Sequence, residues 1–298
     1  MNRNPQPLVS VRVVTYNHER WIAQCLEGIL MQRTAFPFEA VVGEDCSTDG
    51  TRAIVEDYAR RFPDRVRALL HDTNLGAQMN SCRVRQACRG KYLAMIEGDD
   101  YWIDPLKLQR QADFLDAHPE VSLCFHNALI LNERLAATRL FFEAPLKEIL
   151  DFDDIHAQSL PTASLMVRAE IPASQPEWML NIRGGDRLFR LWCLHHGKAG
   201  YLDRIMSVYR RQAEGLDSAG RHTGHQAYYD GILFTLREFD KATGFAHTDS
   251  IRREIKRLRR DQLHLRLGPV YHLLRPGHGI VRLKEYAKWI RQKRHLFN

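Results

Sequence analysis

The feature that most constrains the fold is a regular alternation of short apolar stretches with helical patterns along the first hundred residues. Each apolar stretch is four to eight residues long, and the segments between them repeat apolar residues with a period near 3.6. Strands joined through helices run parallel, because each crossover returns the chain to the same edge of the sheet. The sequence therefore predicts an α/β fold with a largely parallel sheet flanked by helices. The predicted strands are Val9–Thr15, Phe38–Gly43, Val66–Leu70 and Tyr92–Ile96.

The rest of the chain continues this pattern and then changes character. We predict helices over Pro105–Ala117 and from Gly185 onward, and extended segments over Val121–Ala128, Pro161–Val167 and Tyr201–Tyr209. From Thr223 the pattern is helical and basic, with breaks at Gly244 and Pro276. The expected organisation is a globular domain of residues 1–218 followed by a basic helical extension of residues 219–298.

Composition places the chain among ordinary globular proteins. Of its 298 residues, 44% are hydrophobic and 27% are charged. No apolar run approaches the roughly 20 residues of a membrane span, and the N-terminus resembles no signal segment. Six scattered cysteines without a CxxC motif favour reduced thiols and a cytoplasmic location over zinc or disulfides.

The net charge of +7 is distributed unevenly. Residues 219–298 carry 17 Lys/Arg against 7 Asp/Glu, which leaves 26 against 29 in residues 1–218. Two amphipathic basic segments, around 251–265 and 281–294, provide this charge. They either pack on the globular domain or bind an anionic membrane at the inner face of the plasma membrane. Nucleic acid is not an expected partner, because no recognition motif accompanies the charge.

An acidic cluster follows the fourth predicted strand. Glu97-Gly98-Asp99-Asp100 places three carboxylates within four positions, directly before Tyr101-Trp102. Like charges at such spacing repel, and a divalent cation is the usual partner that holds them together. Open α/β sheets bind ligands at the carboxyl ends of their strands. The cluster therefore predicts a site for Mg²⁺ or Mn²⁺ that also holds diphosphate oxygens.

A second acidic pair, Glu44-Asp45, follows the second predicted strand. If the strands are parallel, this pair and the acidic cluster lie at one edge of the sheet and can face one pocket. Asp45 can accept the ring N–H of uracil or thymine. The chain has neither GxxxxGK[ST] nor a GxGxxG motif after its first strand, so it has neither of these glycine-rich phosphate-binding loops.

Four segments in this order resemble glycosyltransferase family 2. They are Val11–Asn17, Val42–Thr51, Asn74–Gly76 and Glu97–Trp102, and the resemblance extends over roughly residues 8–215. It implies a GT-A fold, a nucleotide-diphosphate sugar donor (UDP or dTDP), a divalent metal and inversion at the anomeric carbon. It also implies an acceptor hydroxyl on a glycan or lipid-linked saccharide of a bacterial surface polysaccharide.

The resemblance carries roles to individual residues. It implies a metal at Asp99 and Asp100, and a catalytic base at Asp186, which would deprotonate the acceptor hydroxyl. A helix N-terminus at Gly185 would keep that carboxylate ionised. The implied donor-binding residues are Thr15, Tyr16, Asn17, Glu44, Asp45, Glu97, Asp99 and Arg210.

This chain departs from the family pattern at two positions. Glu97 stands where the family usually has Asp, and Gln212 stands where similar sequences often carry His. Gln212 is a weak, neutral ligand, so Arg210 or Arg211 is the alternative contact for the diphosphate.

Two alternative functions remain beside that of an inverting glycosyltransferase. A sugar-phosphate nucleotidyltransferase would share the sheet and the acidic site, but it needs a glycine- and arginine-rich first loop that Thr15–His18 does not provide. A degenerate, non-catalytic nucleotide-sugar-binding or scaffold protein would explain Glu97 and Gln212.

Overall fold

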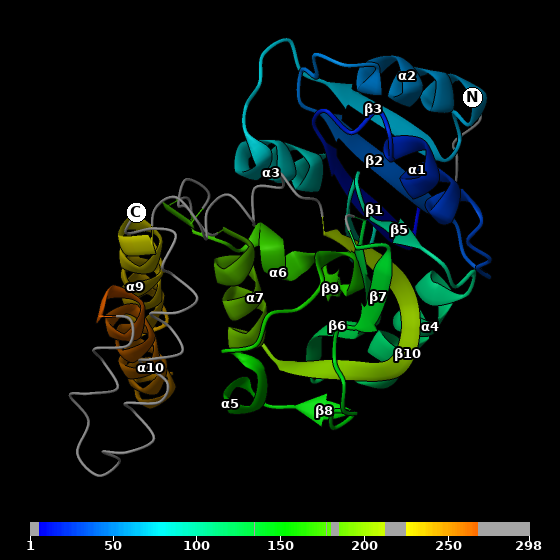
Figure 1. Ribbon diagram of the computed structural model, residues 1–298. Coiled ribbons are helices and arrows are strands. Elements are labelled where there is room, and N and C mark those ends of the chain that lie inside the picture. The colour runs from blue at the N-terminus through cyan, green and yellow to red at the C-terminus, as the bar shows by residue number, and fades with distance from the viewer. Residues whose placement is uncertain (1–5, 134, 177, 180–184, 212–224, 268–298) are drawn as a thin grey trace, which may run out of the picture. The chain divides into compact units, whose positions relative to one another are not determined.

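The computed structural model describes residues 6–133, 135–176, 178–179, 185–211 and 225–267. The chain divides into two compact units, Met1–Ser218 and Ala219–Asn298 (Figure 1). All six cysteines lie in the first unit and are free thiols.

Four parallel strands form the N-terminal half of the sheet, in the order β3-β2-β1-β4. Their bounds are β1 Val9–Thr15, β2 Phe38–Glu44, β3 Val66–Leu70 and β4 Tyr92–Glu97. Thr15 of β1 pairs with Glu44, and Val14 with Glu97. The predicted α/β architecture is therefore confirmed here. Because these strands end in register, the polar residues after β1, β2 and β4 meet at one edge.

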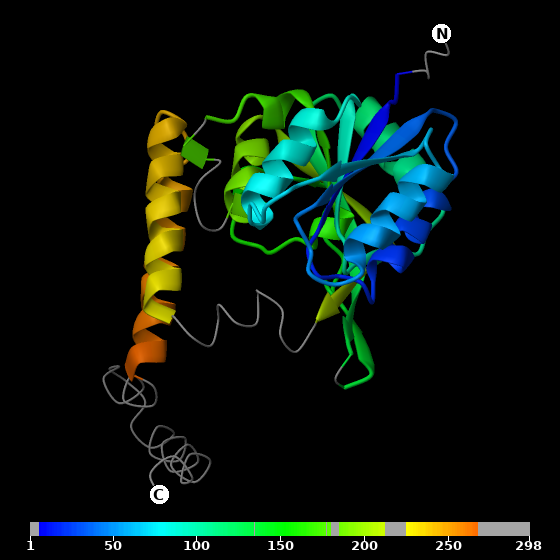
Figure 2. The same ribbon diagram turned by 90° about the horizontal axis from the view of Figure 1, so that it is seen from above.

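Helices cover both faces of this half (Figure 2). They are α1 Ile22–Leu30, α2 Thr51–Arg61 and α3 Ala77–Ala87. Alternate residues of β1 point to opposite faces. Val9, Val11 and Val13 are completely buried in the core that also contains residues of α1 and α2, and each such side chain contributes about 1.5–3 kcal/mol. Val14 packs on the other face with Val84 of α3.

The second half of the sheet is mixed rather than parallel. The order continues β4-β9-β6-β10-β5, and β9 is antiparallel to both β4 and β6, whereas β6 and β10 are parallel. The expected α/β sheet flanked by helices is confirmed, and the antiparallel strand β9 lies between its two parallel parts, β3-β2-β1-β4 and β6-β10. The remaining elements of this unit are β5 Tyr101–Trp102, α4 Lys107–Ala117, β6 Val121–Asn132, β7 Ala137–Leu140, β8 Ile149–Leu150, α5 Phe152–Ile155, η1 Thr162–Ser164, β9 Met166–Arg168, α6 Glu170–Ala173, α7 Gly185–His195 and β10 Lys198–Arg211.

Local differences from the predicted elements have physical causes. The segment Pro161–Val167, predicted as extended, contains the 3₁₀ turn η1 before β9 begins at Met166. The Ser164 hydroxyl donates to the Pro161 carbonyl oxygen at 2.7 Å, which stabilises that turn. Strand β7 was not predicted, because its first three residues are exposed and carry no apolar alternation.

The described part of the second unit is a pair of helices, α9 His225–Ala242 and α10 Thr248–Leu267. They lie side by side in both views (Figures 1 and 2). Leu236 and Phe239 of α9 are completely buried, and Ile251 and Leu258 of α10 are almost so. Ile251 and Leu258, two residues of the apolar stripe of the first basic segment, are therefore buried. Gly244 breaks the helix at a φ of 61°, as predicted. The second basic segment, 281–294, lies outside the described residues.

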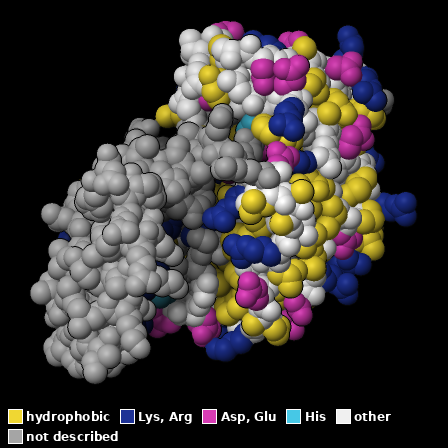
Figure 3. All heavy atoms as spheres, in the orientation of Figure 1, with side chains coloured by type: hydrophobic (Ala, Val, Ile, Leu, Met, Phe, Trp, Pro, Cys, Tyr) yellow, Lys and Arg dark blue, Asp and Glu magenta, His cyan; other side chains and the backbone are white. Residues whose placement is uncertain are grey.

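The surface of the molecule mixes charge types. Figure 3 shows broad apolar areas interrupted by separate basic and acidic side chains. Among the helices that the structure describes, none is both long and apolar enough to span a membrane.

Candidate functional site

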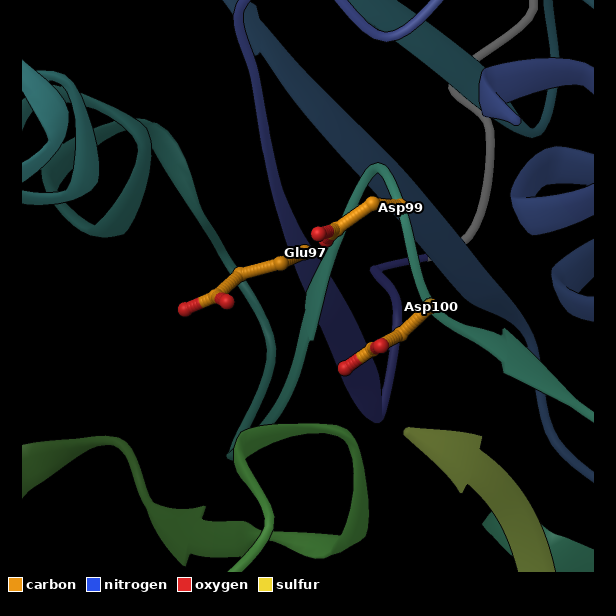
Figure 4. A group of neighbouring side chains, drawn as sticks. All are labelled: Glu97, Asp99 and Asp100. Atoms are coloured by element: carbon orange, nitrogen blue, oxygen red, sulfur yellow. The ribbon is translucent and has the colours of Figure 1, made fainter. Parts of the chain in front are cut away.

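The acidic cluster occupies the turn between β4 and β5. One carboxylate oxygen from each of Glu97, Asp99 and Asp100 lies within 4.8 Å of the others. All three side chains project to the same side of the turn (Figure 4). The Asp100 amide donates to the Glu97 carbonyl oxygen at 3.0 Å, which closes the turn. The predicted metal ligands therefore lie together.

Asp100 is the most constrained member of the acidic cluster. It is 1% exposed, and its Oδ1 accepts the backbone N–H of Arg210 at 2.8 Å. Its Oδ2 is buried and has no hydrogen-bond partner among the residues that the structure describes. Burial raises the pKa of Asp100 well above its usual range, and the charges of Asp99 and Glu97 raise it further. A buried carboxylate oxygen without a donor is costly, and a cation beside it would remove that cost.

Gly98 lets the turn approach the end of β1. A Cβ at this position would lie 2.6 Å from Thr15 Oγ1 and 2.9 Å from His18 Nδ1. Only glycine fits such a close approach. Thr15 is 2% exposed, and its Oγ1 lies 3.2 Å from His18 Nδ1. Burial lowers the pKa of His18, although the charge of Asp99 opposes this shift. His18 was interpreted from the sequence as a structural histidine, because it shows no ligand spacing with carboxylates.

Asn17 organises the loop that follows β2. It has a φ of 55°, and its Oδ1 accepts the backbone N–H of Thr48 at 2.9 Å. Its own N–H donates to Ser47 Oγ at 3.0 Å. The neighbouring Tyr16 is 41% exposed and presents its ring to solvent. Asn17 therefore connects two predicted parts of the donor site, and Tyr16 offers a ring that a base could stack on.

Glu44 is engaged within the protein. It is completely buried, and its Oε1 accepts the Ser47 N–H at 2.7 Å. Its Oε2 forms an ion pair with Arg52 Nε, also at 2.7 Å. Both oxygens thus hold the loop onto α2. In this arrangement Glu44 positions the loop after β2. The direct donor contact expected of Glu44 stays a prediction.

Asp45 holds the next loop along the same edge. Its two carboxylate oxygens accept the backbone N–H groups of Leu75 and Gly76, at 2.8 and 2.9 Å. Asn74 donates back to the Asp45 carbonyl oxygen at 3.1 Å. Each carboxylate oxygen has a second lone pair, so Asp45 retains the capacity to accept a base N–H.

Arg210 lies beside the acidic cluster but is already partnered. Its Nη1 pairs with Glu133 at 2.7 Å, and its Nη2 bonds to Gln24. The guanidinium carbon lies 4.7 Å from the centre of the Tyr101 ring. Within the described part of the chain, its buried Nε has no hydrogen-bond partner. A diphosphate contact would need Arg210 to exchange one of these partners, or to use Nε. Gln212, the predicted weak ligand, lies outside the described residues.

Asp186 stands in the first turn of α7 and borders a small pocket. It is exposed. The pocket is lined by Met95, Leu160, Thr162, Leu165, Asp186, Phe189 and Arg190. Met95 lies two residues before Glu97 on β4, so this pocket adjoins the strand that carries the acidic cluster. Asp186 therefore lies in the first turn of α7, as the sequence predicted, and its role as a base stays a prediction.

Arg12 is a buried cation within electrostatic range of Glu97 and Asp186, and it was not among the predicted site residues. It lies in the middle of β1, is 1% exposed, and donates from Nη1 to Ser81 Oγ at 2.8 Å. Burial lowers the pKa of Arg12, while the charges of Glu97 and Asp186 raise it. A lone arginine inside a β-branched strand was the available signal, since a buried cation needs carboxylates close by.

The family comparison identifies the domain type. Residues 10–168 match the sequence model of the protein family described as "Glycosyl transferase family 2". An uncharacterized protein of Mycobacterium tuberculosis is 37% identical over 234 residues, which are 76% of this chain and 63% of that protein. This chain thus spans under two thirds of that relative. Staphylococcus aureus TarS, named a poly(ribitol-phosphate) β-N-acetylglucosaminyltransferase, is 38% identical over 114 residues, which are 37% of this chain and 19% of TarS.

Two solved structures have a similar fold. A fragment of S. aureus TarS in complex with UDP-GlcNAc gives a TM-score of 0.68 at 21% identity, covering 95% of this chain and 78% of that one. A mannosyltransferase from Pyrobaculum calidifontis, in complex with GDP-Man and Mn²⁺, gives 0.59 at 14%, covering 97% and 81%. At these identities the likeness establishes the fold, which is GT-A as expected.

Proposed function

This chain belongs to glycosyl transferase family 2, and from that premise we propose that it is an inverting, metal-dependent glycosyltransferase. The donor is a nucleotide-diphosphate sugar, and the acceptor is a hydroxyl of a glycan or lipid-linked saccharide used for surface polysaccharide. UDP is the favoured nucleotide, because the relative TarS binds UDP-GlcNAc and because Asp45 suits a pyrimidine N–H.

The observation that carries the proposal is the unpartnered Oδ2 of Asp100 inside a group of three carboxylates. The donor set is entirely oxygen, which suits Mg²⁺ or Mn²⁺. Asp99 and Asp100 would hold the ion, and Glu97 would assist or contact the donor. When bound, such an ion neutralises negative charge on a leaving diphosphate.

The side chains at the ends of β1 and β2 would bind the nucleoside. Asn17 and Asp45 hold the two loops in place, and Tyr16 would stack on the base. The buried Glu44–Arg52 ion pair keeps the first loop attached to α2. The nucleotide pocket is thus organised before the donor arrives, which lowers the entropic cost of binding.

Asp186 would act as the general base. In an inverting transfer it removes the proton of the acceptor hydroxyl while that oxygen attacks C1 and the bond to the diphosphate breaks. Its exposure lets an acceptor reach the carboxylate, and the pocket beside it offers apolar walls. Arg12, buried on the same face as Met95, holds a positive charge close to both Glu97 and Asp186.

Titration calorimetry with UDP and Mn²⁺ tests the donor site. We expect binding that depends on the metal and disappears in Asp99→Ala, with Asp57→Ala as a control, because Asp57 is an exposed carboxylate on α2. A panel of nucleotide sugars, screened for slow hydrolysis, then identifies the sugar. Activity that persists in full with EDTA would exclude the metal. Absence of metal-dependent UDP binding would favour the scaffold alternative.

The basic extension provides a second, separate proposal about location. The exposed cations of α10 would attract an anionic membrane surface, whereas Ile251 and Leu258 of its apolar stripe are buried. Any membrane contact would therefore be electrostatic and sensitive to salt. Vesicle sedimentation at low and high salt, with the full chain, checks this expectation.

A further inference from the structure

Two buried groups of opposite charge at the acidic cluster leave hydrogen-bonding capacity unused. Asp100 Oδ2 and Arg210 Nε are both buried, and neither has a partner among the residues that the structure describes. The two residues do contact each other, because the Arg210 backbone N–H donates to Oδ1 of the same carboxylate at 2.8 Å. A guanidinium this close to a carboxylate ordinarily forms a charge-assisted hydrogen bond with it. Another contact therefore directs the Arg210 side chain away from Asp100 Oδ2.

Glu133 provides that contact. It lies in the turn after β6, and its Oε1 pairs with Arg210 Nη1 at 2.7 Å. Gln24 of α1 accepts a hydrogen bond from Arg210 Nη2. The guanidinium carbon lies 4.7 Å from the centre of the Tyr101 ring. Because the Arg210 side chain is only 8% exposed, packing leaves it few other conformations while these contacts persist.

The carboxylate of Glu133 is itself held by the region that precedes α1. Its Oε1 also accepts the indole N–H of Trp21 at 3.2 Å. The backbone N–H of Trp21 donates to the His18 carbonyl oxygen at 2.8 Å, which fixes Trp21 to the loop after β1. Glu133 is 26% exposed and is held by donors from two separate parts of the chain. A carboxylate fixed in this way can keep a guanidinium in one orientation.

We propose that Glu133 is a positioning residue of the donor site, which holds the Arg210 guanidinium away from Asp100 Oδ2 and keeps that oxygen free for the metal ion. The inference rests on the proposed function, because it takes the acidic cluster as the metal site. Without Glu133, the Arg210 side chain would turn toward the three carboxylates of the acidic cluster, which attract a cation. An arginine paired there would compete with the metal ion for the same oxygen.

Mn²⁺ binding tests this competition. On the full chain without nucleotide, the electron paramagnetic resonance signal of free Mn²⁺ gives the dissociation constant. Glu133→Ala should raise this constant about tenfold, at the lower end of the range for residues that support metal ligands. Combining Glu133→Ala with Arg210→Met should return it to the wild-type value or below, because the competing guanidinium is gone and the backbone N–H remains. A double variant that binds Mn²⁺ as weakly as Glu133→Ala would overturn the proposal.

Asp116→Ala is the matched control for the loss of one carboxylate. Like Glu133, Asp116 accepts from a cation and from an aromatic side chain, because its Oδ1 lies 2.5 Å from both Lys91 Nζ and the Tyr92 hydroxyl. Tyr92 begins β4, whose opposite end leads into the acidic cluster. Asp116→Ala should therefore bind Mn²⁺ as the wild type does. An equal loss of affinity in Asp116→Ala and Glu133→Ala would reduce the effect to net charge and overturn the proposal.

Glu133→Gln decides the question if Glu133→Ala fails to fold. It keeps an acceptor oxygen for Trp21 and Arg210 but loses the charge that strengthens the bond to the guanidinium. It should weaken Mn²⁺ binding about threefold, and Arg210→Met should again remove the loss. Unchanged Mn²⁺ binding in Glu133→Gln, or a loss that persists with Arg210→Met, would contradict the proposal.

Crystal structures of the wild type and Glu133→Ala, grown without divalent metal, test the position of Arg210 independently of any ligand. The guanidinium should contact Asp100 in the variant and not in the wild type. A guanidinium that stays away from Asp100 in Glu133→Ala would overturn the proposal. If the wild type binds no Mn²⁺ with or without UDP, the proposed metal site fails. The two structures still decide whether Glu133 directs Arg210 away from Asp100.

Discussion

Two acidic groups stand at the ends of neighbouring parts of the sheet, and they differ in what surrounds them. Glu44 and Asp45 after β2 have all four carboxylate oxygens engaged by partners within the protein. In the acidic cluster after β4, Asp100 keeps one buried oxygen without a partner. The sequence presents both as carboxylates that follow a strand. The structure separates a group that holds loops in place from a group suited to hold a cation.

The comparison shows that hydrogen-bond satisfaction distinguishes the two groups where charge alone does not. A satisfied carboxylate lowers the free energy of the fold, and its removal should cost stability. An unsatisfied one raises that free energy and is retained for what it binds. We therefore expect the acidic cluster to govern metal binding and catalysis, and Glu44 and Asp45 to govern stability.

The largest expected effect is on catalysis. Replacing Asp99 by Ala or Asp100 by Asn should reduce donor hydrolysis and transfer at least about 100-fold. A bound divalent ion lowers the reaction barrier by several kcal/mol, and these variants would lose that stabilisation. Asp100→Asn keeps the Oδ1 that accepts the Arg210 N–H, so its melting temperature should stay at or above that of the wild type. A variant that melts much earlier would make Asp100 a structural residue.

The next effect is metal-dependent stability. Mn²⁺ at 100 times its dissociation constant should raise the free energy of unfolding by about 2.7 kcal/mol, and EDTA should reverse this. Chemical denaturation with and without Mn²⁺ measures the difference. Asp100→Asn should show almost none of it, whereas Glu44→Gln should keep it. Equal stabilisation of the wild type and Asp100→Asn would remove the acidic cluster as the metal site.

A smaller loss of stability should follow from breaking the first acidic group. Glu44→Ala should lower the free energy of unfolding by about 2 kcal/mol, between the values for exposed and buried ion pairs. Glu44 is buried, whereas the Arg52 side chain is 33% exposed. Arg60→Ala, which breaks an exposed pair with Asp57, should change stability by less than about 0.5 kcal/mol. Unchanged stability of Glu44→Ala together with lost UDP affinity would make Glu44 a ligand contact instead.

The smallest expected effect concerns Asp45. Asp45→Asn retains one acceptor oxygen for the N–H groups of Leu75 and Gly76 and should cost about 1 kcal/mol. Amide exchange at these two positions should quicken, and calorimetry should show weaker UDP binding. If exchange and stability are unchanged, the two hydrogen bonds do not hold the loop.

Local patterns predicted the N-terminal half well. Val9–Thr15 and Val66–Leu70 are strands with the predicted bounds, because each is a short run of β-branched and apolar residues next to a helical pattern. The acidic cluster was found because its three carboxylates are adjacent in the chain. The family comparison confirms the resemblance that placed these motifs in glycosyl transferase family 2.

The features that escaped prediction depend on distant partners. Strand β9 lies between β4 and β6, so its neighbours are fixed by tertiary packing and no local pattern encodes them. Arg12 bonds to Ser81 of α3, and the charges that act on it, those of Glu97 and Asp186, come from two further elements. The satisfied state of Glu44 depends on Arg52, eight residues away. Residue types predicted which side chains are acidic or basic, but whether their hydrogen bonds are satisfied depends on the three-dimensional structure.

The hydrogen bond between Asp100 and the backbone of Arg210 joins residues 110 positions apart. Strand β5 also pairs with β10, through Trp102 with Ser207 and Tyr101 with Val208. Contacts of such sequence separation form late, because a long loop must close first. On the ribosome the N-terminal strands can pair long before β10 emerges. The acidic turn therefore acquires its final form only when nearly the whole domain has been synthesised, and a partly made chain does not carry a finished donor site.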